Sequence, residues 1–291
     1  MYNPCMMTNR RSFLKSSALA PLAAPAIARS AQSPNDRLRA AVVGLRGRGQ
    51  SHIRGFLDLA GQNVELAALC DVDATVLRER AAGVEKETGR KPATCGDMRK
   101  ILDDKSIDLI GFATPNHWHA LGTIWACQAG KDVYCEKPGT HNIFEGQQVM
   151  KAAEKYGRIV QHGTQNRSIP AIMEGVARIK EGLIGRVYNA RGIAYKVRQP
   201  MGQITEDPVP EGFDWDGWLG PAPMVPYSNK RTLRPAGQSW HMLWDYGNGE
   251  IGNQGVHELD IIRWALDLQD HPTRVSSMGG VYLYKDSQEC P

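Results

Sequence analysis

Between residues 38 and 161 the chain alternates short apolar runs with longer amphipathic stretches, and this alternation limits the fold more than any other feature. Strands are predicted at 38–43, 64–69, 108–113, 132–135 and 158–161, and helices at 73–88, 117–129 and 143–156. Strands that alternate with helices of about 10 to 15 residues predict βαβ units and a parallel, doubly wound sheet. We therefore expect an α/β first domain over residues 38–159.

The pattern changes after residue 160. A helix is predicted at 169–180, a half-exposed strand at 187–195, a further helix at 255–266 and a strand at 274–284. The long stretch between residues 196 and 250 is irregular and rich in Pro, Gly and Trp. This mixture predicts a second, α+β domain over residues 160–291.

A glycine-rich turn, residues 44–49 (GLRGRG), follows the first strand and opens a helix. It matches the first and last glycines of the fingerprint G-x-G-x-x-G, which lets a pyrophosphate approach the backbone at a helix N-terminus. Arg46 stands at the middle glycine position, where its guanidinium can pair with phosphate. The expected pyrophosphate-binding residues are Gly44, Arg46, Gly47, Arg48 and Gly49.

Asp71 ends the second strand, about 20 residues after the turn, where a carboxylate accepts hydrogen bonds from the adenosine ribose. Such a carboxylate repels a 2′-phosphate, so it favours NAD over NADP. Arg46 and Arg48 lie close enough in sequence to reverse that preference, which leaves NADP open. Asp71 could instead cap the next helix, but Asp73 is better placed for that role.

Two further segments follow predicted strands. Residues 136–138 (EKP) follow the strand at 132–135, which places Lys137 at a carboxyl end, where open α/β sheets bind ligands. Residues 114–119 (TPNHWH) follow the strand at 108–113 and would lie against the nicotinamide half of the cofactor. The expected contacts are Thr114, Pro115, Asn116, His119, Glu136 and Lys137. Two histidines without a third ligand make a poor metal site, so we predict no metal.

Together these segments resemble the glucose-fructose oxidoreductase/inositol dehydrogenase (Gfo/Idh/MocA) family over about residues 37–290. The resemblance rests on 44–49, Asp71, 113–119 (ATPNHWH), 136–138, 161–165 (QHGTQ) and 252–260 (GNQGVHELD). It implies an NAD(P)-dependent oxidoreductase of sugars or polyols, with a Rossmann-like first domain and a second domain built on an open, mainly antiparallel sheet. Members usually continue well beyond the strand at 274–284, so the resemblance implies a truncated second domain.

The resemblance also implies roles for four residues. Lys137 would hydrogen-bond the substrate hydroxyl and contact the nicotinamide ribose, and Gln165 would be a further cofactor contact. His257, at the start of the 255–266 helix, would take the hydroxyl proton, since a helix N-terminus favours neutral imidazole. Many members carry an aspartate where this chain has Asn253. An amide can orient a hydroxyl but cannot accept its proton, so the proton relay and the reaction type stay open.

Four of the seven tryptophans fall between residues 215 and 244. Indole faces stack on the C–H faces of sugars, so this segment is a candidate substrate surface. Its members are Trp215, Trp218, Trp240 and Trp244, with Asp245 as a hydroxyl ligand and Asp214, Asp216 and Glu250 as further acids. The alternative is that these indoles pack against the first domain or against a second subunit of a homo-oligomer.

The first 31 residues predict export. Residues 9–15 (NRRSFLK) resemble the bacterial twin-arginine signal, and a mildly apolar stretch at 16–28 ends in an A-x-A cleavage pattern. That stretch is too short to span a bilayer as a stable helix. We expect a twin-arginine signal peptide at 1–31, a linker at 32–37, passage through the twin-arginine machinery and a periplasmic or otherwise exported protein.

The charge balance argues against a nucleic-acid partner. The formal net charge is +4, and the four basic residues of the leader account for it. No other segment is apolar for about 18 residues, so no stable membrane span is expected. The six cysteines show no C-x-x-C spacing and predict neither a disulfide framework nor a zinc site.

The functional prediction is an exported enzyme that moves a hydride between NAD(P) and a sugar or polyol carbon. Because free NAD is scarce outside the cytoplasm, we expect the cofactor to be tightly bound. One alternative is a glycosidase of the same family that oxidises its substrate transiently. Another is a non-catalytic remnant or carbohydrate-binding protein.

Overall fold

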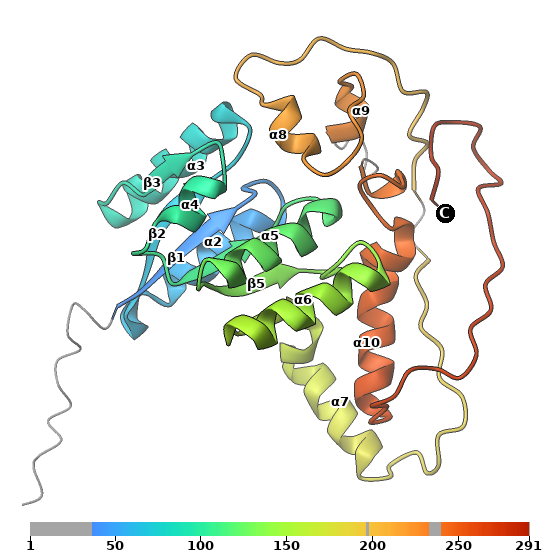
Figure 1. The fold of residues 1–291 in the computed structure, drawn as a ribbon. Coiled ribbons are helices and arrows are strands. Elements are labelled where there is room, and N and C mark those ends of the chain that lie inside the picture. The colour runs from blue at the N-terminus through green and yellow to red at the C-terminus, as the bar shows by residue number, and fades with distance from the viewer. Residues whose placement is uncertain (1–36, 196–197, 233–239, 291) are drawn as a thin grey trace, which may run out of the picture. The chain divides into compact units, whose positions relative to one another are not determined.

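A six-stranded, all-parallel sheet forms the first part of this computed structural model, which describes residues 37–195, 198–232 and 240–290 (Figure 1). Its strands are β1 (Leu38–Val43), β2 (Val64–Cys70), β3 (Ala93–Cys95), β4 (Leu109–Phe112), β5 (Asp132–Glu136) and β6 (Val160–Gly163). The order β3-β2-β1-β4-β5-β6 is that of a doubly wound, Rossmann-type sheet, which confirms the predicted fold class. The predicted leader, and the linker up to residue 36, lie outside the described residues.

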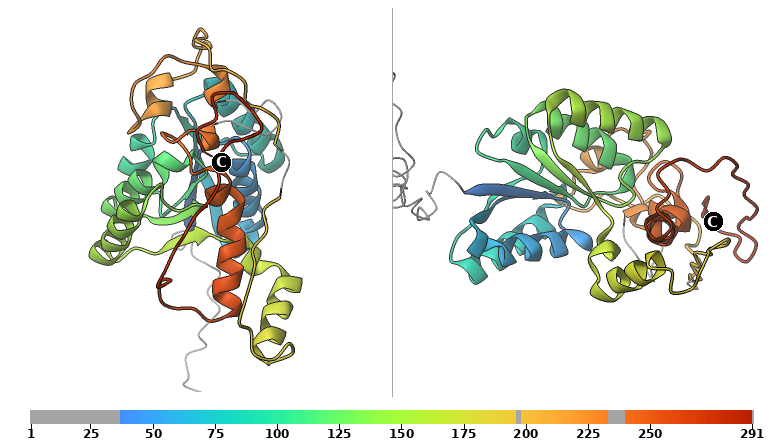
Figure 2. Two further views of the ribbon diagram at one scale, coloured as in Figure 1. Left: turned by 90° about the vertical axis from the view of Figure 1, so that its right-hand side faces the viewer. Right: turned by 90° about the horizontal axis from the view of Figure 1, so that it is seen from below.

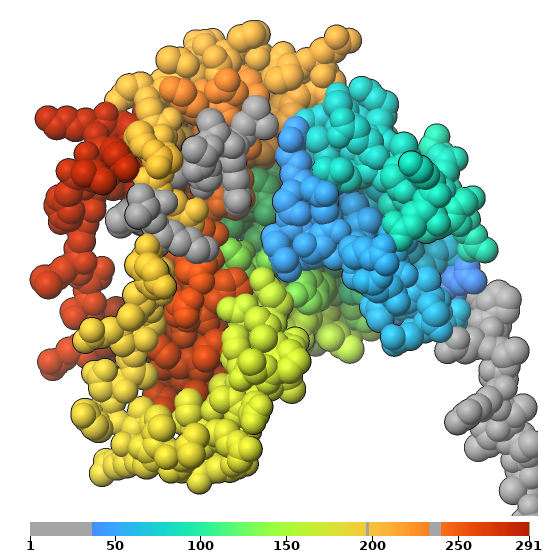
Figure 3. All heavy atoms as spheres, turned by 180° about the vertical axis from the view of Figure 1, so that it is seen from behind, coloured from blue at the N-terminus to red at the C-terminus, as the bar shows by residue number. Residues whose placement is uncertain are grey.

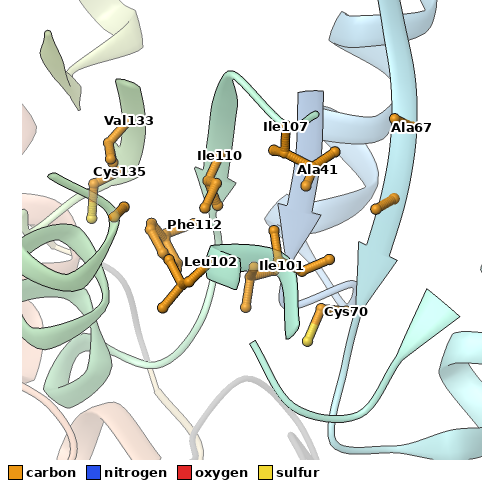
Figure 4. Close-up of a cluster of buried hydrophobic side chains, with 13 residues drawn as sticks. Ala41, Ala67, Cys70, Ile101, Leu102, Ile107, Ile110, Phe112, Val133 and Cys135 are labelled. Carbon is orange, nitrogen blue, oxygen red and sulfur yellow. The ribbon is translucent and has the colours of Figure 1, made fainter. Parts of the chain in front are cut away.

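Helices cover both faces of this sheet, as Figure 2 shows. They are α2 (Arg48–Asp58), α3 (Ala74–Thr88), α4 (Arg99–Asp103), α5 (Asn116–Gln128) and α6 (Ile143–Tyr156). Successive residues of a strand point to opposite faces, so β1 sends Ala41 and Val43 into one apolar cluster and Val42 into another. Figure 4 shows the first cluster, in which Ile101 and Leu102 of α4 pack on strand residues. Burial on both faces explains why the strands are continuous apolar runs.

The sheet extends past the expected domain boundary at residue 159. Strand β6 pairs with β5 from Val160 to Gly163, so the residues that were assigned to the second domain complete the first sheet. The edge strand β3 was not predicted, because three residues give no readable period.

The second part, from residue 164, contains helices but no strand among its described residues. They are α7 (Pro170–Lys180), α8 (Trp215–Leu219), α9 (Asn229–Thr232) and α10 (Val256–Ala265), with a π-helical turn, η6 (Ile251–Gly255), leading into α10. The strands predicted at 187–195 and 274–284 are wrong, since both segments are irregular. Alternating apolar residues fit a strand only where another strand supplies hydrogen bonds, and the described part of the chain offers neither segment such a neighbour. In Figures 1 and 3 the segment 274–284, drawn in red, is an irregular chain at the outside of the second region.

Part of the second region packs directly on the first domain. A cluster of buried aromatic and aliphatic side chains from residues 201–246 takes in Val72, which follows β2. Beside it, Asp214 N–H donates to Val72 O at 2.9 Å and Ala74 N–H donates to Gly212 O at 2.9 Å. In Figure 3 the orange segment lies against the blue and teal first domain. The two parts therefore share a core next to the carboxyl end of β2.

None of the helices in the described ranges is both long enough and apolar enough to cross a membrane.

Candidate nucleotide-binding and catalytic site

A cavity of about 1150 Å³ opens at the carboxyl ends of the central strands. Its lining includes the last residues of three strands, Val43 of β1, Cys70 of β2 and Glu136 of β5, and Ala113, which follows β4. The second region contributes Trp218, Tyr227, Asn229, Trp240, His241 and Asn253, among others. This edge of a doubly wound sheet is where such folds bind nucleotides.

The glycine turn fits a dinucleotide phosphate. Gly44 has φ +85°, and a Cβ there would lie 2.7 Å from the carbonyl oxygen of Ala113. A Cβ on Gly49 would lie 1.9 Å from the carbonyl oxygen of Gly44, so the turn closes only without side chains. Gly47, the N-cap of α2, provides no side-chain cap. The start of α2 thus has no capping side chain, although Gly49 N–H donates to Arg46 O at 2.8 Å. Its positive dipole end favours an anion.

Asp71 lies in the cavity wall and organises the turn as well. Its carboxylate accepts the N–H of Leu45 at 2.7 Å and the N–H of Asp73 at 2.9 Å. Burial raises the pKa of Asp71, although these two N–H donors oppose the rise. Asp73 caps α3 through the N–H groups of Thr75 and Val76, as predicted. With capping assigned to Asp73, the Asp71 carboxylate is held in the cavity wall by two backbone N–H groups.

Both arginines of the turn are already paired with carboxylates of this chain. Arg46 Nη2 lies 2.5 Å from Asp73 Oδ2, and Arg48 Nε lies 3.1 Å from Glu136 Oε1. The sequence left open whether these arginines favour a 2′-phosphate. In the structure their charges are balanced before any ligand binds.

Glu136 is buried between the two ends of the site. His52 Nε2, on α2, lies 3.1 Å from the same Glu136 Oε1, so that α2 is tied to the end of β5. Burial alone would raise the pKa of Glu136, but His52 and the charge of Arg48 lower it to about 2. His52 was missed at the sequence level, because nothing in a lone helical histidine indicates a partner more than 80 residues away.

Lys137 reaches across to the second region. Its Nζ donates to the backbone oxygen of Asn253 at 2.6 Å and to the Oδ1 of Asn253 at 3.0 Å. Lys137 and Asn253 both line the cavity. The structure thus brings together two of the three residues expected at the reaction centre.

His257 lies close to Lys137 but does not line the cavity. Its burial, and then the charge of Lys137, lower the pKa of His257, which keeps the imidazole neutral at pH 7. Its Nδ1 is buried and has no hydrogen-bond partner within the described residues. The expectation that a helix N-terminus favours this neutral form is wrong, because η6 precedes α10 and His257 lies inside a continuous helical run.

The segment 114–119 combines ligand-facing and structural residues. Thr114, Pro115, Asn116 and His119 line the cavity, and Thr114 Oγ1 is buried without a partner in the part of the chain that the structure describes. His119 lies between two carbonyl oxygens, Pro138 O at 2.6 Å and Thr114 O at 2.9 Å. His119 therefore holds the loop after β4 against the loop that carries Lys137.

Two neighbouring contacts tie α5 to the second region. His117 is buried, with Nε2 3.1 Å from Trp218 O, and burial lowers the pKa of His117 to about 4. Asn116 Nδ2 donates to Asn248 Oδ1 at 2.9 Å. Neither histidine of the pair 117 and 119 faces a metal position, and the described residues contain no cluster of three potential metal ligands.

The tryptophan segment divides between cavity and core. Trp218 and Trp240 line the cavity, whereas Trp215, Trp244 and Asp245 do not. Trp215 stacks on Trp218 with ring centroids 5.0 Å apart, and its indole N–H donates to Val225 O at 2.8 Å. Trp244 and Asp245 point to solvent. The substrate surface inferred from all four indoles is thus reduced to two.

Gln165, in the 3₁₀ turn η4 (Gln165–Ser168), does not line the cavity either. Its Oε1 is buried, and no described residue donates a hydrogen bond to it.

The sheet order, the glycine turn and the strand-end cavity define a Rossmann-type nucleotide-binding protein. The chain belongs to the Gfo/Idh/MocA oxidoreductase family. Residues 38–164 match the family's NAD-binding Rossmann fold and residues 179–279 match its C-terminal alpha/beta domain, together most of the chain.

Curated relatives include two kinds of protein. A levoglucosan dehydrogenase from Pseudarthrobacter phenanthrenivorans is 35% identical over 114 residues, 39% of this chain and 29% of the relative. A glycosyl hydrolase family 109 protein from Shewanella pealeana is 29% identical over 174 residues, 52% of this chain and 38% of the relative. The chain thus spans well under half the length of these relatives.

Solved structures share the fold. The WlbA dehydrogenase from Bordetella pertussis, in complex with NADH and UDP-GlcNAcA, gives a TM-score of 0.54 at 22% identity over 79% of this chain and 57% of that one. A levoglucosan dehydrogenase in complex with NADH gives 0.53 at 21% identity over 79% and 54%.

Proposed function

We propose that this protein uses NAD to oxidise a carbinol carbon of a sugar or polyol, or to catalyse the reverse reduction. The observation that carries the proposal is Lys137, held at the end of β5 in the wall of a cavity whose other end has the glycine turn and Asp71. Bound NAD would supply the hydride acceptor. The family and its dehydrogenase members support this reaction class.

The side chains have distinct roles in this proposal. The turn at 44–49 and the start of α2 bind the pyrophosphate, and Asp71 binds the adenosine ribose. The Lys137 ammonium stabilises negative charge on the substrate oxygen, which is worth most in a site partly closed from water. Neutral His257, whose pKa is lowered by burial and by Lys137, takes the hydroxyl proton at a ring nitrogen.

We further propose NAD rather than NADP. Arg46 and Arg48 are engaged by Asp73 and Glu136, so neither arginine of the turn is left unpaired for a 2′-phosphate. Asp71 would repel such a phosphate directly.

The test of the function is Lys137→Met with Lys155→Met, an exposed lysine of α6, as the matched control. Loss of the ammonium lowers kcat on a substrate polyol at least about 100-fold, while calorimetry shows unchanged NAD binding. Lys155→Met keeps full activity. Absence of turnover by both wild type and Lys137→Met on every sugar and polyol tried would instead favour the non-catalytic alternative.

A second candidate is an NAD-dependent glycosidase that oxidises and then reduces its substrate. Several relatives are glycosyl hydrolase family 109 proteins, and Asn253 departs from the aspartate of many dehydrogenases. This reaction releases aryl alcohol from an aryl glycoside with no net NADH. Stoichiometric NADH without released aryl alcohol would exclude it.

Export by the twin-arginine route is proposed from the sequence of residues 1–31 alone, and it entails a tightly held cofactor. Nucleotide released by acid from protein purified from the periplasm, at about one per chain, is the expected result. A periplasmic protein that carries and binds no nucleotide would support export but contradict the tightly held cofactor. A protein found only in the cytoplasm would contradict export.

A further inference from the structure

A chain of polar contacts leads from Lys137 into the second region. Lys137 Nζ donates to Asn253 Oδ1 at 3.0 Å, and Asn253 Nδ2 lies 3.2 Å from Glu250 Oε1. Glu250 Oε1 in turn pairs with Arg198 Nη2 at 2.5 Å, and both of these side chains are only about a fifth exposed, at 22% and 21%. Three ionic groups are therefore linked through one neutral amide.

The chemistry of the three groups fixes how that amide lies. An ammonium only donates hydrogen bonds and a carboxylate only accepts them. Asn253 must therefore turn its oxygen toward Lys137 and its nitrogen toward Glu250. Aspartate at 253 could satisfy Lys137, but it would face Glu250 with a second carboxylate. With Glu250 as neighbour, an amide at 253 satisfies both contacts, whereas an acid would satisfy only the contact with Lys137.

The backbone strengthens the same contact. Asn253 lies in the π-helical turn η6, which departs from the regular i→i+4 hydrogen-bond pattern. Its carbonyl oxygen accepts Lys137 Nζ at 2.6 Å, in addition to the side-chain contact. Two oxygens of one residue hold the ammonium, and Glu250 fixes the rotamer that supplies one of them.

We propose that Glu250 is a positioning residue for Lys137 and acts through the Asn253 amide. The effect of Glu250 on catalysis rests on the proposed function. The coupling between residues 250 and 253 does not depend on that function. The charged groups that act on neighbouring His257 are Lys137, Glu136, Glu258 and Arg48, and Arg198 faces Glu250 from the far end. Among these described groups, Glu250 is the acceptor that Asn253 Nδ2 contacts.

The experiment is a double-mutant cycle of Glu250→Gln, Asn253→Asp and the double variant. Glu250→Gln lowers kcat about 10-fold without changing KM or NAD affinity, and Asn253→Asp does the same because two carboxylates now face each other. In the double variant the amide introduced at 250 donates to the carboxylate introduced at 253, and kcat returns to within about threefold of wild type. Glu174→Gln, which breaks an exposed Glu–Arg pair on α7, has no effect.

A second readout needs no turnover. Competitive acetylation of Lys137 with acetic anhydride, followed by mass spectrometry, gives the pH midpoint at which its amine reacts. Glu250→Gln shifts that midpoint down by about half a unit or more, since a carboxylate that stabilised the ammonium is gone. In the Asn253→Asp background the same change has a smaller effect, because the carboxylate introduced at 253 contacts the ammonium directly and still stabilises it.

The outcomes separate the two hypotheses. If the labelling midpoints show coupling between residues 250 and 253 but the enzyme is inactive on every polyol, the role of Glu250 stands and the proposed reaction is refuted. If the enzyme is active but the effects of the two substitutions simply add, in kcat and in labelling, the role of Glu250 is refuted and the proposed reaction stands. If Asn253→Asp does not fold, Glu250→Gln decides alone, and an unchanged midpoint overturns the inference.

Discussion

The first domain and the second region both line the cavity, but different forces hold their residues in place. In the first domain two apolar clusters clamp the sheet from either side, and the glycine turn is fixed by its own backbone. The described residues of the second region form no sheet, and several are positioned by hydrogen bonds to the first domain, such as those from His117 and Asn116. The glycine turn is thus held by contacts within the first domain, whereas the second-region residues that line the cavity depend on docking.

The largest effect is expected from a substitution that disrupts the glycine turn of the first domain. Gly49→Ala places a Cβ 1.9 Å from Gly44 O, so the turn must open. NAD affinity falls at least about 1000-fold, or about 4 kcal/mol, in calorimetry. Gly55→Ala, in α2 with open space around it, leaves affinity unchanged and serves as control. A loss under about tenfold would show that the turn does not set cofactor binding.

The pH dependence of stability tests how the second region docks on the first domain. The folded-state pKa of His117 is lowered to about 4 from its ordinary 6.5, so between these values the unfolded chain binds more protons. The buried, neutral His117 therefore makes its full contribution to the free energy of unfolding above pH 6.5. About 3 kcal/mol of that free energy is lost as the pH falls toward 4.

His117→Gln removes this titration and keeps a donor for Trp218 O. Its free energy of unfolding, measured with urea at several pH values and compared with wild type, should fall less between pH 6.5 and 4. Parallel curves for the two proteins would mean that His117 is not held neutral by docking.

The smallest effect is expected from an ion pair of the first domain, beside the place where the second region docks. Asp73→Asn keeps the helix cap, since asparagine caps as well as aspartate, but releases the exposed Arg46 from its ion pair. NADP affinity rises about two- to fivefold while NAD affinity holds, because such pairs contribute at most about 1 kcal/mol. Asp58→Asn, which removes one of the two carboxylate partners of Arg54 elsewhere on α2, changes neither affinity. An equal rise for both nucleotides would place Arg46 on the pyrophosphate.

Local sequence predicted the first domain well because its constraints are local. The predicted strand over 38–43 matches β1 in both bounds, and its last four residues are buried in succession, as expected for a strand covered on both faces. The strands at 187–195 and 274–284 failed because alternation reports which residues could share a face, and not whether a neighbouring strand exists. Trp215 and Trp218 lie three residues apart and stack on each other, so no sequence pattern tells which one lines the cavity.

The site was predictable where a residue follows a strand, as Lys137 does, because topology then dictates its place. It was not predictable where contacts cross more than 100 residues, as between Lys137 and Asn253. In sequence Asn253 is only a departure from a family pattern, whereas in the structure it lies between Lys137 and Glu250 and contacts both.

Val72 packs among the aromatic residues of the second region, so neither part can lose its structure without exposing apolar surface of the other. That continuity makes the two parts a single cooperative unit from residue 38 onward, which agrees with their grouping as one compact body. Heating should therefore produce one calorimetric transition, with equal van't Hoff and calorimetric enthalpies, instead of separate melting of a cofactor domain and a substrate domain.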